Sequence, residues 1–425
     1  MQGLRRCAAL CAALVSAAAV GGCAAGPHAP AKPGSHPIRL TSSQVATLRS
    51  LGAGDTSFGL NLLSVLCRSQ PGANVLISPY SVATGLSMAY LGARGGTATA
   101  MARVLHLPAA GTGLIAGLSA RRALLASLNR PGVTFAESNS LWADPSLGTN
   151  RSYRAALRAS YRAGVTHVPL LSAPERARAE INSAVAAQTR GHIRDLLPAG
   201  SIPPDSIGWV LTNALYLKAA WRHRFDRANT APGPFRTGNG TVVTARYMHG
   251  SGYGFARTAS GWTATELRYR GGQLAMLALL PPASSASPGT RGACQVPTVK
   301  ELRALARGLG GSGEDHKIAL PKVTLASSEP LRGVLTRLGM GLAFSGQADF
   351  SGISPEAWRL RFVQHAATLE INENGAVATA ATAAGIQPSA LTLPLIFDRP
   401  YLLIIRDMLT GEPLMMAWVA NPAQP

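Results

Sequence analysis

The chain has 425 residues, of which 47% are hydrophobic, so it can bury a large core without the disulfides or metals that small domains need. Its formal charge is +20, from 40 Lys and Arg against 20 Asp and Glu. The basic residues are spread along the chain with no zinc-finger or RNA-binding pattern between them, which argues against a nucleic-acid partner. Non-specific attraction to an anionic polymer remains compatible with the charge.

The beginning of the chain has the pattern of a secretion signal. Two arginines precede an apolar run over residues 8–20, which is too short to cross a bilayer comfortably as a helix. The sequence VGGC at its end resembles the lipobox of bacterial lipoproteins, which implies a signal peptide over residues 1–22 and a lipid on Cys23. Residues 23–37, rich in Pro, Gly and Ala, are predicted to be a flexible tether. We expect an extracellular protein on the outer face of a bacterial membrane; an ordinary signal peptide with a chance cysteine is the alternative.

Hydrophobic spacing predicts the main elements that follow. Helical periodicity covers residues 43–69 and 81–105, and Ser78 and Pro79 precede the second stretch. Short apolar or alternating runs bounded by Gly, Pro or charge predict strands over residues 207–221, 273–282, 318–325, 361–371 and 401–407. Because helices crowd the first half and strands the second, the predicted class is α+β. No repeat, composition break or linker interrupts residues 38–425, which predicts one large domain.

Residues that could carry enzyme chemistry are scarce. No metalloprotease, hydrolase or phosphate-loop motif occurs, so the sequence predicts no enzyme, cofactor or metal site. Residues 308–313 fit GxGxxG but lack the strand before and the helix after that a dinucleotide site needs, which predicts a plain loop. His365 lies in an apolar strand and is a core histidine more readily than a general base. Cys67 and Cys294 could pair in an oxidising compartment, although sequence does not establish their separation.

An uncharged segment between Glu373 and Asp398 is the most informative part of the chain. It begins NGAVATAATAAG, with no large apolar residue that a buried helix could pack. A disordered linker would require the tail after Asp398 to fold alone, and that tail is too short. Small uncharged residues can instead be exposed in one state and added as a strand to a sheet in another, because no charge has to leave water.

Seven blocks in order resemble the serpin family over nearly the whole mature chain. They are NVLISPYSVATGLSMAYLGARGGT, INSAVAAQTRGHIRDLLPAGSI, LTNALYLKAAWRHRFD, LPKVTL, LGMGLAFSGQADFSGIS, QHAATLEINENG and FDRPYLLIIRDMLTGEPLMMAWVANP. The resemblance implies the family fold: a large mixed main sheet, smaller sheets, a shell of about eight or nine helices, and an exposed reactive loop near residues 373–397. It also implies a monomeric suicide inhibitor of serine or cysteine endopeptidases. In that mechanism the loop is cut, the protease is held covalently, and the loop inserts into the main sheet.

The resemblance assigns roles within the loop. The hinge residues are Glu373, Gly375 and the small residues Ala376, Ala378, Ala380 and Thr382, which would point inward after insertion. Ala376 and Val377 depart from the Thr or Ser followed by Glu of many inhibitory members. The family spacing places the reactive bond at Ser389-Ala390, with a slip of one or two residues open. A small residue after Pro388 suits an elastase-like or subtilisin-like target.

The resemblance also gives mechanical roles to polar residues under the sheet. Ser78, Ser81, Asn213 and His365 match the cluster that controls sheet opening, and Trp221 matches the tryptophan where insertion begins. Two other functions remain open at this stage. The loop can be a mere substrate, as in non-inhibitory relatives, or the protein can be a cell-surface lipoprotein that binds an anionic polymer. If a polyanion accelerates inhibition, the basic residues near Arg121 and Arg122 are the predicted contact.

Overall fold

The structure is a computed structural model that describes residues 39–204, 208–282, 294–311, 316–357, 359–361, 363–375 and 394–424. All of these residues belong to one compact unit. The predicted signal peptide, Cys23 and the tether lie outside the described residues. So do Ala376, Ala378, Ala380, Thr382, Ser389 and Ala390.

Eight α-helices occur in the described residues. They are α1 (Ser42–Ser69), α2 (Pro79–Tyr90), α3 (Gly95–Leu105), α4 (Thr112–Ala126), α5 (Arg151–Tyr161), α6 (Pro174–Gln188), α7 (Val299–Gly311) and α8 (Arg332–Leu335). The Ser78 hydroxyl caps α2 by accepting from the Ser81 N–H, and Pro79 is at its first turn. None of the described helices is long and apolar enough to cross a membrane.

Two helix predictions need correction. The stretch over residues 81–105 forms two helices, because Arg94 takes an extended conformation (φ −133°, ψ 163°) and starts α3. The predicted loop at residues 308–313 is wrong for its first part, since α7 continues to Gly311. A Cβ on Gly308 would lie 3.0 Å from the Cβ of Ala256, so this glycine lets α7 pack closely on a strand.

The strands form three hydrogen-bonded groups. The largest has the order β1-β14-β13-β8-β7-β6-β9-β12, with β5 paired to β6; the second is β10-β11 and the third is β3-β2-β4. The bounds are β1 (Val75–Ile77), β2 (Val133–Ala143), β3 (Val165–His167), β4 (Trp209–Ala219), β5 (Ala231–Arg236), β6 (Val242–Arg257), β7 (Thr263–Arg268), β8 (Leu274–Leu280), β9 (His316–Pro321), β10 (Val323–Pro330), β11 (Gln364–Ile371), β12 (Leu395–Ile396), β13 (Tyr401–Asp407) and β14 (Pro413–Val419). The strand predicted over residues 318–325 is two strands in different sheets, divided at Lys322.

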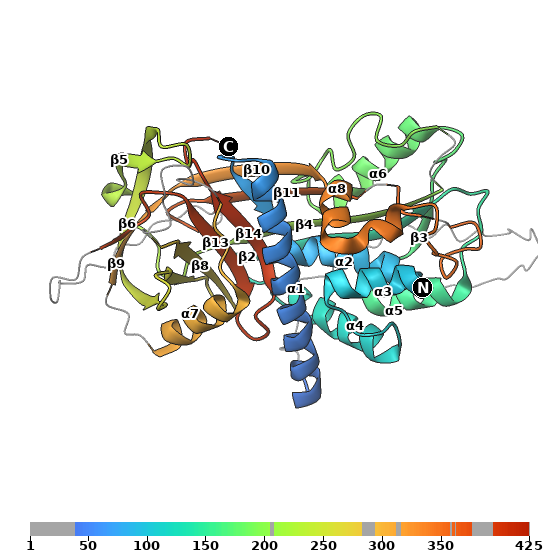
Figure 1. The fold of residues 1–425 in the computed structure, drawn as a ribbon, viewed down its shortest axis with the longest axis horizontal. Helices are drawn as coiled ribbons and strands as arrows, with labels where there is room; N and C mark the ends of the chain where they lie inside the picture. Colours follow the sequence, from blue (N-terminus) through green and yellow to red (C-terminus); the bar gives the residue numbers. More distant parts are fainter. Residues whose placement is uncertain are drawn as a thin grey trace, which may run out of the picture. The chain divides into compact units, whose positions relative to one another are not determined.

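The hydrophobic core lies on both faces of the central strands. Every residue of β8 and of β14 is buried, which explains their continuous apolar sequences. In Figure 1, α1 passes beside β14, and α2 lies below β4 and β11. The layered arrangement of sheets and helices confirms the predicted α+β class.

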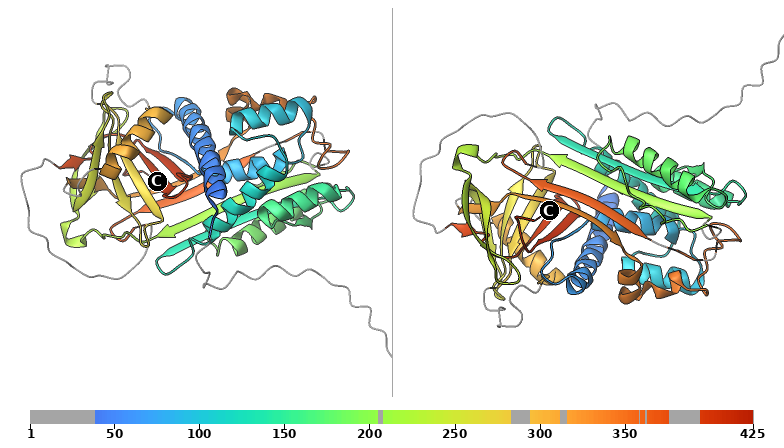
Figure 2. Two further views of the ribbon diagram at one scale, coloured as in Figure 1. Left: turned by 90° about the horizontal axis from the view of Figure 1, so that it is seen from below. Right: turned by 90° about the horizontal axis from the view of Figure 1, so that it is seen from above.

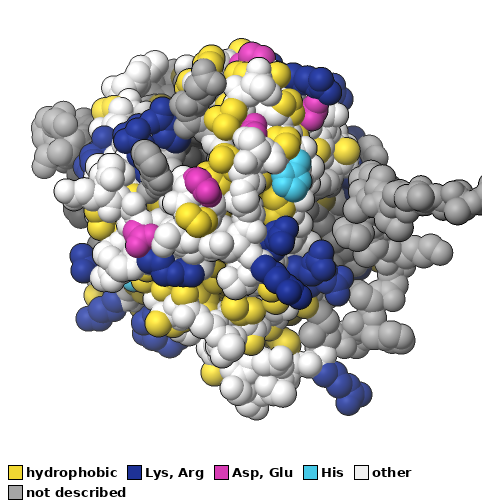
Figure 3. Space-filling model, turned by 90° about the vertical axis from the view of Figure 1, so that its right-hand side faces the viewer, with side chains coloured by type: hydrophobic (Ala, Val, Ile, Leu, Met, Phe, Trp, Pro, Cys, Tyr) yellow, Lys and Arg dark blue, Asp and Glu magenta, His cyan; other side chains and the backbone are white. Residues whose placement is uncertain are grey.

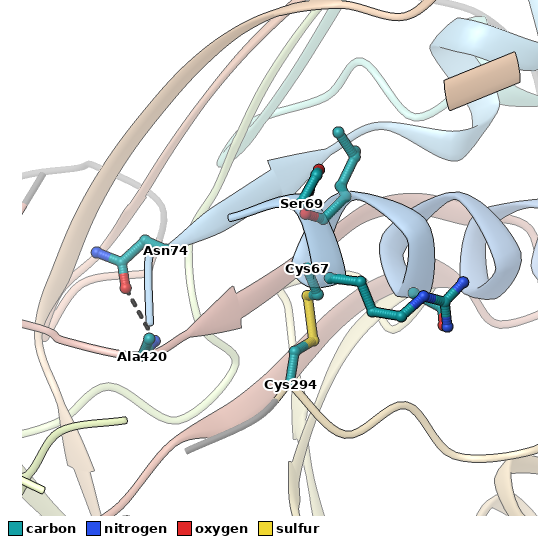
Figure 4. The surroundings of a disulfide bond; sticks show 8 residues. Cys67, Ser69, Asn74, Cys294 and Ala420 are labelled. Carbon is teal, nitrogen blue, oxygen red and sulfur yellow. Dashed lines mark hydrogen bonds between the residues drawn. A yellow bond between two sulfur atoms is a disulfide. The ribbon is translucent and has the colours of Figure 1, made fainter. Parts of the chain in front are cut away.

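A disulfide joins Cys67, in the last turn of α1, to Cys294, which precedes α7 (Figure 4). The two Cα atoms are 5.6 Å apart, a normal separation for a disulfide. Close by, the Asn74 side chain accepts a hydrogen bond of 2.9 Å from the backbone N–H of Ala420. The end of α1 is therefore tied covalently to a segment 227 residues away.

Removal of this disulfide should destabilise the protein substantially. Closing a loop of 227 residues restricts the unfolded chain by an amount on the order of 5 kcal/mol. We expect Cys67→Ala, Cys294→Ala and the double variant to lose similar stability in urea unfolding. Reduction of the wild-type protein should give the same loss, whereas a double variant as stable as wild type would contradict this role.

Candidate functional site

Strands β4 and β11 lie side by side without pairing along their length. Each is hydrogen-bonded on its other side, β4 to β2 and β11 to β10, and no ladder joins β4 to β11 although both are fully described. The right-hand view in Figure 2, seen from above, shows the two strands running together at one end and diverging toward the other. A sheet edge of this kind carries unpaired backbone N–H and C=O groups that can bind another strand.

A cavity of about 480 Å³ lies where the two strands diverge. Its walls come from α2, β4, β11 and residues 350–363, and most of its lining is apolar, including Leu141, Leu211 and Phe350. The side chains of Ser81, Asn213 and His365 also line it. We call the space between β4 and β11, together with this cavity, the open slot. It is bounded on both sides by strand edges, so its shape suits an extended chain.

The structure brings together the four polar residues predicted to lie under the sheet. The Ser78 N–H donates to Nε2 of His365 over 3.0 Å, and the Ser78 hydroxyl donates to the Leu414 carbonyl over 2.6 Å. The Ser81 hydroxyl donates to Asn213 Oδ1. These bonds connect α2 to both strands that border the open slot. The predicted control of sheet opening stays a prediction, but the contacts it requires are present.

Asn139 is a member of this network that sequence analysis missed. Its Oδ1 accepts a hydrogen bond from Nδ2 of Asn213, so the network extends from β4 to β2. In the strand register Asn139 and Asn213 are direct partners. They are 74 residues apart in sequence, and only the pairing of β2 with β4 brings them together.

His365 should make the stability of the protein sensitive to acid. Burial lowers its pKa to about 4, against 6.5 in an unfolded chain, and its Nε2 acts as a neutral acceptor. Between pH 6.5 and 4 the folded protein binds fewer protons here than the unfolded chain, so this stabilisation is present above pH 6.5 and is lost as the pH falls. The total is about 3 kcal/mol.

Comparison with His365→Gln isolates this contribution, because every other titrating group is shared. We expect the difference in unfolding free energy between wild type and variant to shrink by about 3 kcal/mol from pH 7 to pH 4. A difference that is constant across this range would contradict a neutral, buried histidine.

A second cluster closes the narrow end of the slot. The backbone N–H of Trp221 donates to the Asn374 carbonyl over 3.0 Å, and its indole N–H donates to the Asn372 carbonyl over 2.9 Å. Its ring stacks on Tyr269 with the centroids 4.4 Å apart. Trp221 therefore lies where β4 and β11 meet, as predicted for the starting point of insertion.

Glu373 is held in this cluster by partners that sequence analysis did not name. Its Oε1 accepts from Lys322 Nζ and from the Thr230 hydroxyl, both over 3.0 Å, although the carboxyl is almost fully buried. Burial alone would raise the pKa of Glu373, but these hydrogen bonds and the charge of Lys322 outweigh it and lower that pKa. In the sequence, the indication of this ion pair was Lys322, a charged residue inside the otherwise uncharged run LPKVTL.

Gly375 occupies a position that requires glycine. Its φ is +119°, and a Cβ there would collide with the carbonyl oxygen of Ala219 and lie 2.7 Å from the backbone nitrogen of Trp221. Gly375 also bridges to Ala220. The chain therefore leaves β11 directly against the end of β4.

The predicted polymer contact at Arg121 is wrong. This side chain is 3% exposed and pairs with Asp55 over 2.7 Å and with Glu412 over 3.8 Å. It also lies over the Tyr80 ring, 5.1 Å from the centroid. Arg121 links α1, α4 and the β13–β14 turn in the interior, so no external polymer can contact it.

The fold and the open slot define a class of protein: a large α+β domain in which two neighbouring strands, β4 and β11, lie side by side without pairing. In the sequence, an uncharged segment follows Gly375, at the end of this gap. A family model described as Serpin (serine protease inhibitor) matches residues 53–422. The chain belongs to the serpin family, whose members are generally inhibitors that bind target serine proteases.

Named relatives and solved structures agree with this membership. The chain is 31% identical to the leukocyte elastase inhibitor of Bos taurus over 88% of its length and the whole of that protein. It is 36% identical to an uncharacterized serpin-like protein of Thermococcus kodakarensis, over 82% of this chain and 81% of that one. Uncleaved ovalbumin matches with a TM-score of 0.75 at 26% identity, over 88% of this chain and 100% of its own. An Arabidopsis serpin in its native stressed conformation matches with a TM-score of 0.74 at 25% identity, over 89% and 99%.

Proposed function

We propose that this protein is a single-use inhibitor of serine endopeptidases that works by inserting its cut reactive loop into the open slot. The observation that carries the proposal is the unpaired edge on both β4 and β11, directly below the point where Gly375 leaves the sheet. The following residues are small and uncharged, so they can enter without burying a charge.

Insertion has a physical driving force in this geometry. β4 offers eleven residues, so an antiparallel strand that starts at residue 376 would reach residue 386. At least about ten new backbone hydrogen bonds would form, each contributing about 1 kcal/mol net. The part of the strand over the cavity would also fill the 480 Å³ beneath it.

The chemical step belongs to the target protease. Its serine oxygen attacks the carbonyl carbon of Ser389, the bond to Ala390 breaks, and the serine proton passes to the departing amine of Ala390. The product is an ester between the protease and Ser389. Insertion of the residues before Ser389 carries the attached protease along the sheet, and distortion of its active site prevents water from completing hydrolysis.

The proposed targets are elastase-like or subtilisin-like proteases. Ser389 follows Pro388 and offers no positive charge to a trypsin-like pocket. A slip of one or two residues would place Ala390 or Leu391 at the cut and favour a larger apolar pocket. A relative named for its inhibition of leukocyte elastase supports the first choice.

Incubation with elastase-like, subtilisin-like and trypsin-like proteases, followed by a denaturing gel, tests the proposal. We expect a band at the summed mass with the first two, and a released C-terminal peptide that begins at Ala390 or within two residues of it. Cleavage by every protease without such a band would instead indicate a substrate, and would overturn the inhibitor function.

We also propose that the domain is anchored at the outer face of a bacterial membrane through a lipid on Cys23. The VGGC sequence and the tether of residues 23–37 support this location. A tether of fifteen residues would leave the reactive loop free to meet proteases in the medium. Mass spectrometry of the mature N-terminus should find an acylated Cys23; an unmodified terminus at another residue would contradict the anchor.

A further inference from the structure

Four arginines form a stripe along one face of α5, and we call Arg151, Arg154, Arg158 and Arg162 the α5 stripe. At 100° per residue, these positions fall within an arc of about 80°. All four side chains are exposed, and Arg162 caps the end of the helix. The adjoining face is buried through Tyr153, Leu157, Ser160 and Tyr161, so packing fixes the orientation of the stripe.

Among the residues that the structure describes, no acidic side chain pairs with the α5 stripe. From residue 105 to residue 173 the sequence contains two acidic residues, and both are occupied elsewhere. Asp144 is buried and accepts from the backbone of Leu171, and Glu137 accepts from the Tyr80 hydroxyl.

Arg122 of α4 extends the positive surface. Helix α4 packs against α5. Burial and the positive charge of Arg162 lower the pKa of Arg122, and the Glu137 carboxyl works in the opposite direction. Figure 3 looks at the side of the molecule on which α3, α5 and α6 lie in Figure 1, and it shows basic side chains over this face with some acidic ones between them. Arg122 thus adds a positive charge beside the α5 stripe, which the Glu137 carboxyl offsets in part.

We propose that the α5 stripe binds a linear polymer bearing phosphate groups, laid along the helix. Arginine forks match phosphate oxygens in pairs, and the stripe spans about 16 Å with neighbouring side chains about 5–6 Å apart. A regular chain of phosphates can contact each arginine in turn, whereas a single small anion would meet one or two of them.

The residues between the arginines favour a polymer over other anionic partners. The exposed positions on α5 besides the stripe are Ser152, Ala155 and Ala159, which are all small. A protein partner would need large side chains at the centre of the contact, and a membrane partner would need apolar groups to enter the bilayer. The exposed face of α5 offers positive charge without large apolar side chains. This site is separate from the open slot and would hold the inhibitor on anionic polymer whether or not the loop is intact.

The test measures binding of the full-length protein to linear polyphosphate across a range of salt concentrations. The first variant carries Arg151→Gln, Arg154→Gln and Arg158→Gln. The matched control carries Lys300→Gln, Arg303→Gln and Arg307→Gln, which removes the same charge at the same spacing from exposed positions of α7. Each lost phosphate contact lowers the slope of log affinity against log salt by about 0.7.

We expect the α5 variant to lose at least tenfold in affinity at low salt and about 2 units of slope, while the α7 variant stays within twofold of wild type. Circular dichroism should show both variants folded, because every substituted side chain is exposed. Equal losses in the two variants would show a net-charge effect only and overturn the site. Binding to phosphatidylglycerol vesicles but not to polyphosphate would also overturn it, as would no binding by wild type.

Discussion

Ala380→Glu should convert this protein from an inhibitor into a substrate. Residue 380 would face inward after insertion, so the variant must bury a carboxylate in the open slot. Desolvation of an unpaired charge costs several kcal/mol, and about 3 kcal/mol added to the insertion barrier would slow insertion about 100-fold. Hydrolysis of the acyl-enzyme would then be faster than insertion of the loop. The covalent band on a denaturing gel should fall at least tenfold while cleavage of the loop continues.

Ala381→Glu is the matched control for this variant. It places the same side chain on the neighbouring alanine, which would face solvent after insertion. It should form the covalent complex within about twofold of wild type. Equal inhibition by both variants would contradict the insertion mechanism. An equal loss of covalent complex in both variants would indicate that the added charge affects protease docking instead.

Glu373→Lys should loosen the end of the slot where β4 and β11 meet. The variant removes the acceptor of Lys322 and Thr230 and sets a second ammonium beside Lys322. Because Glu373 is 6% exposed and Lys322 is 36% exposed, we expect a loss of about 2–3 kcal/mol, below that of a fully buried pair. Hydrogen exchange at the amides of Trp221 and Phe225, which donate to residues 374 and 373, reports this opening. It should accelerate roughly 50-fold if these amides exchange by local opening.

Two further variants separate the ion pair from a general charge effect. Glu180→Lys makes the same change on α6, where the carboxylate pairs with Arg176 and touches none of these residues, and should leave exchange at Trp221 near that of wild type. Combining Lys322→Glu with Glu373→Lys restores opposite charges and should recover part of the lost stability. Failure of this reversal to recover any stability would mean that the pair itself contributes little.

The long strands could be predicted because their signal is local. Apolar runs such as residues 401–407 indicate a strand before any partner is known, and the structure confirms them. The division at Lys322 could not be predicted, since the alternation continues through it while the chain passes from one sheet to another. The break after Tyr90 was missed for the same reason, because apolar periodicity persists on both sides.

The polar contacts of the site depend on distant pairing. The family resemblance named Ser78, Ser81, Asn213, His365 and Trp221, and the structure places each of them along the borders of the open slot. Their partners were missed where the pairing joins residues far apart in sequence, as for Asn139 or Lys322. The interpretation of Arg121 as a surface residue failed because its acidic partners come from other segments.

Thermal unfolding before and after a single cut in the reactive loop tests the central claim most directly. If the freed segment enters the open slot, about ten new hydrogen bonds should raise the midpoint by more than about 10 °C. A synthetic peptide with the sequence of residues 376–386 should no longer bind the cut protein, because the slot is full. A midpoint that stays the same or falls after the cut would show that the loop remains outside the sheet, and would contradict the account.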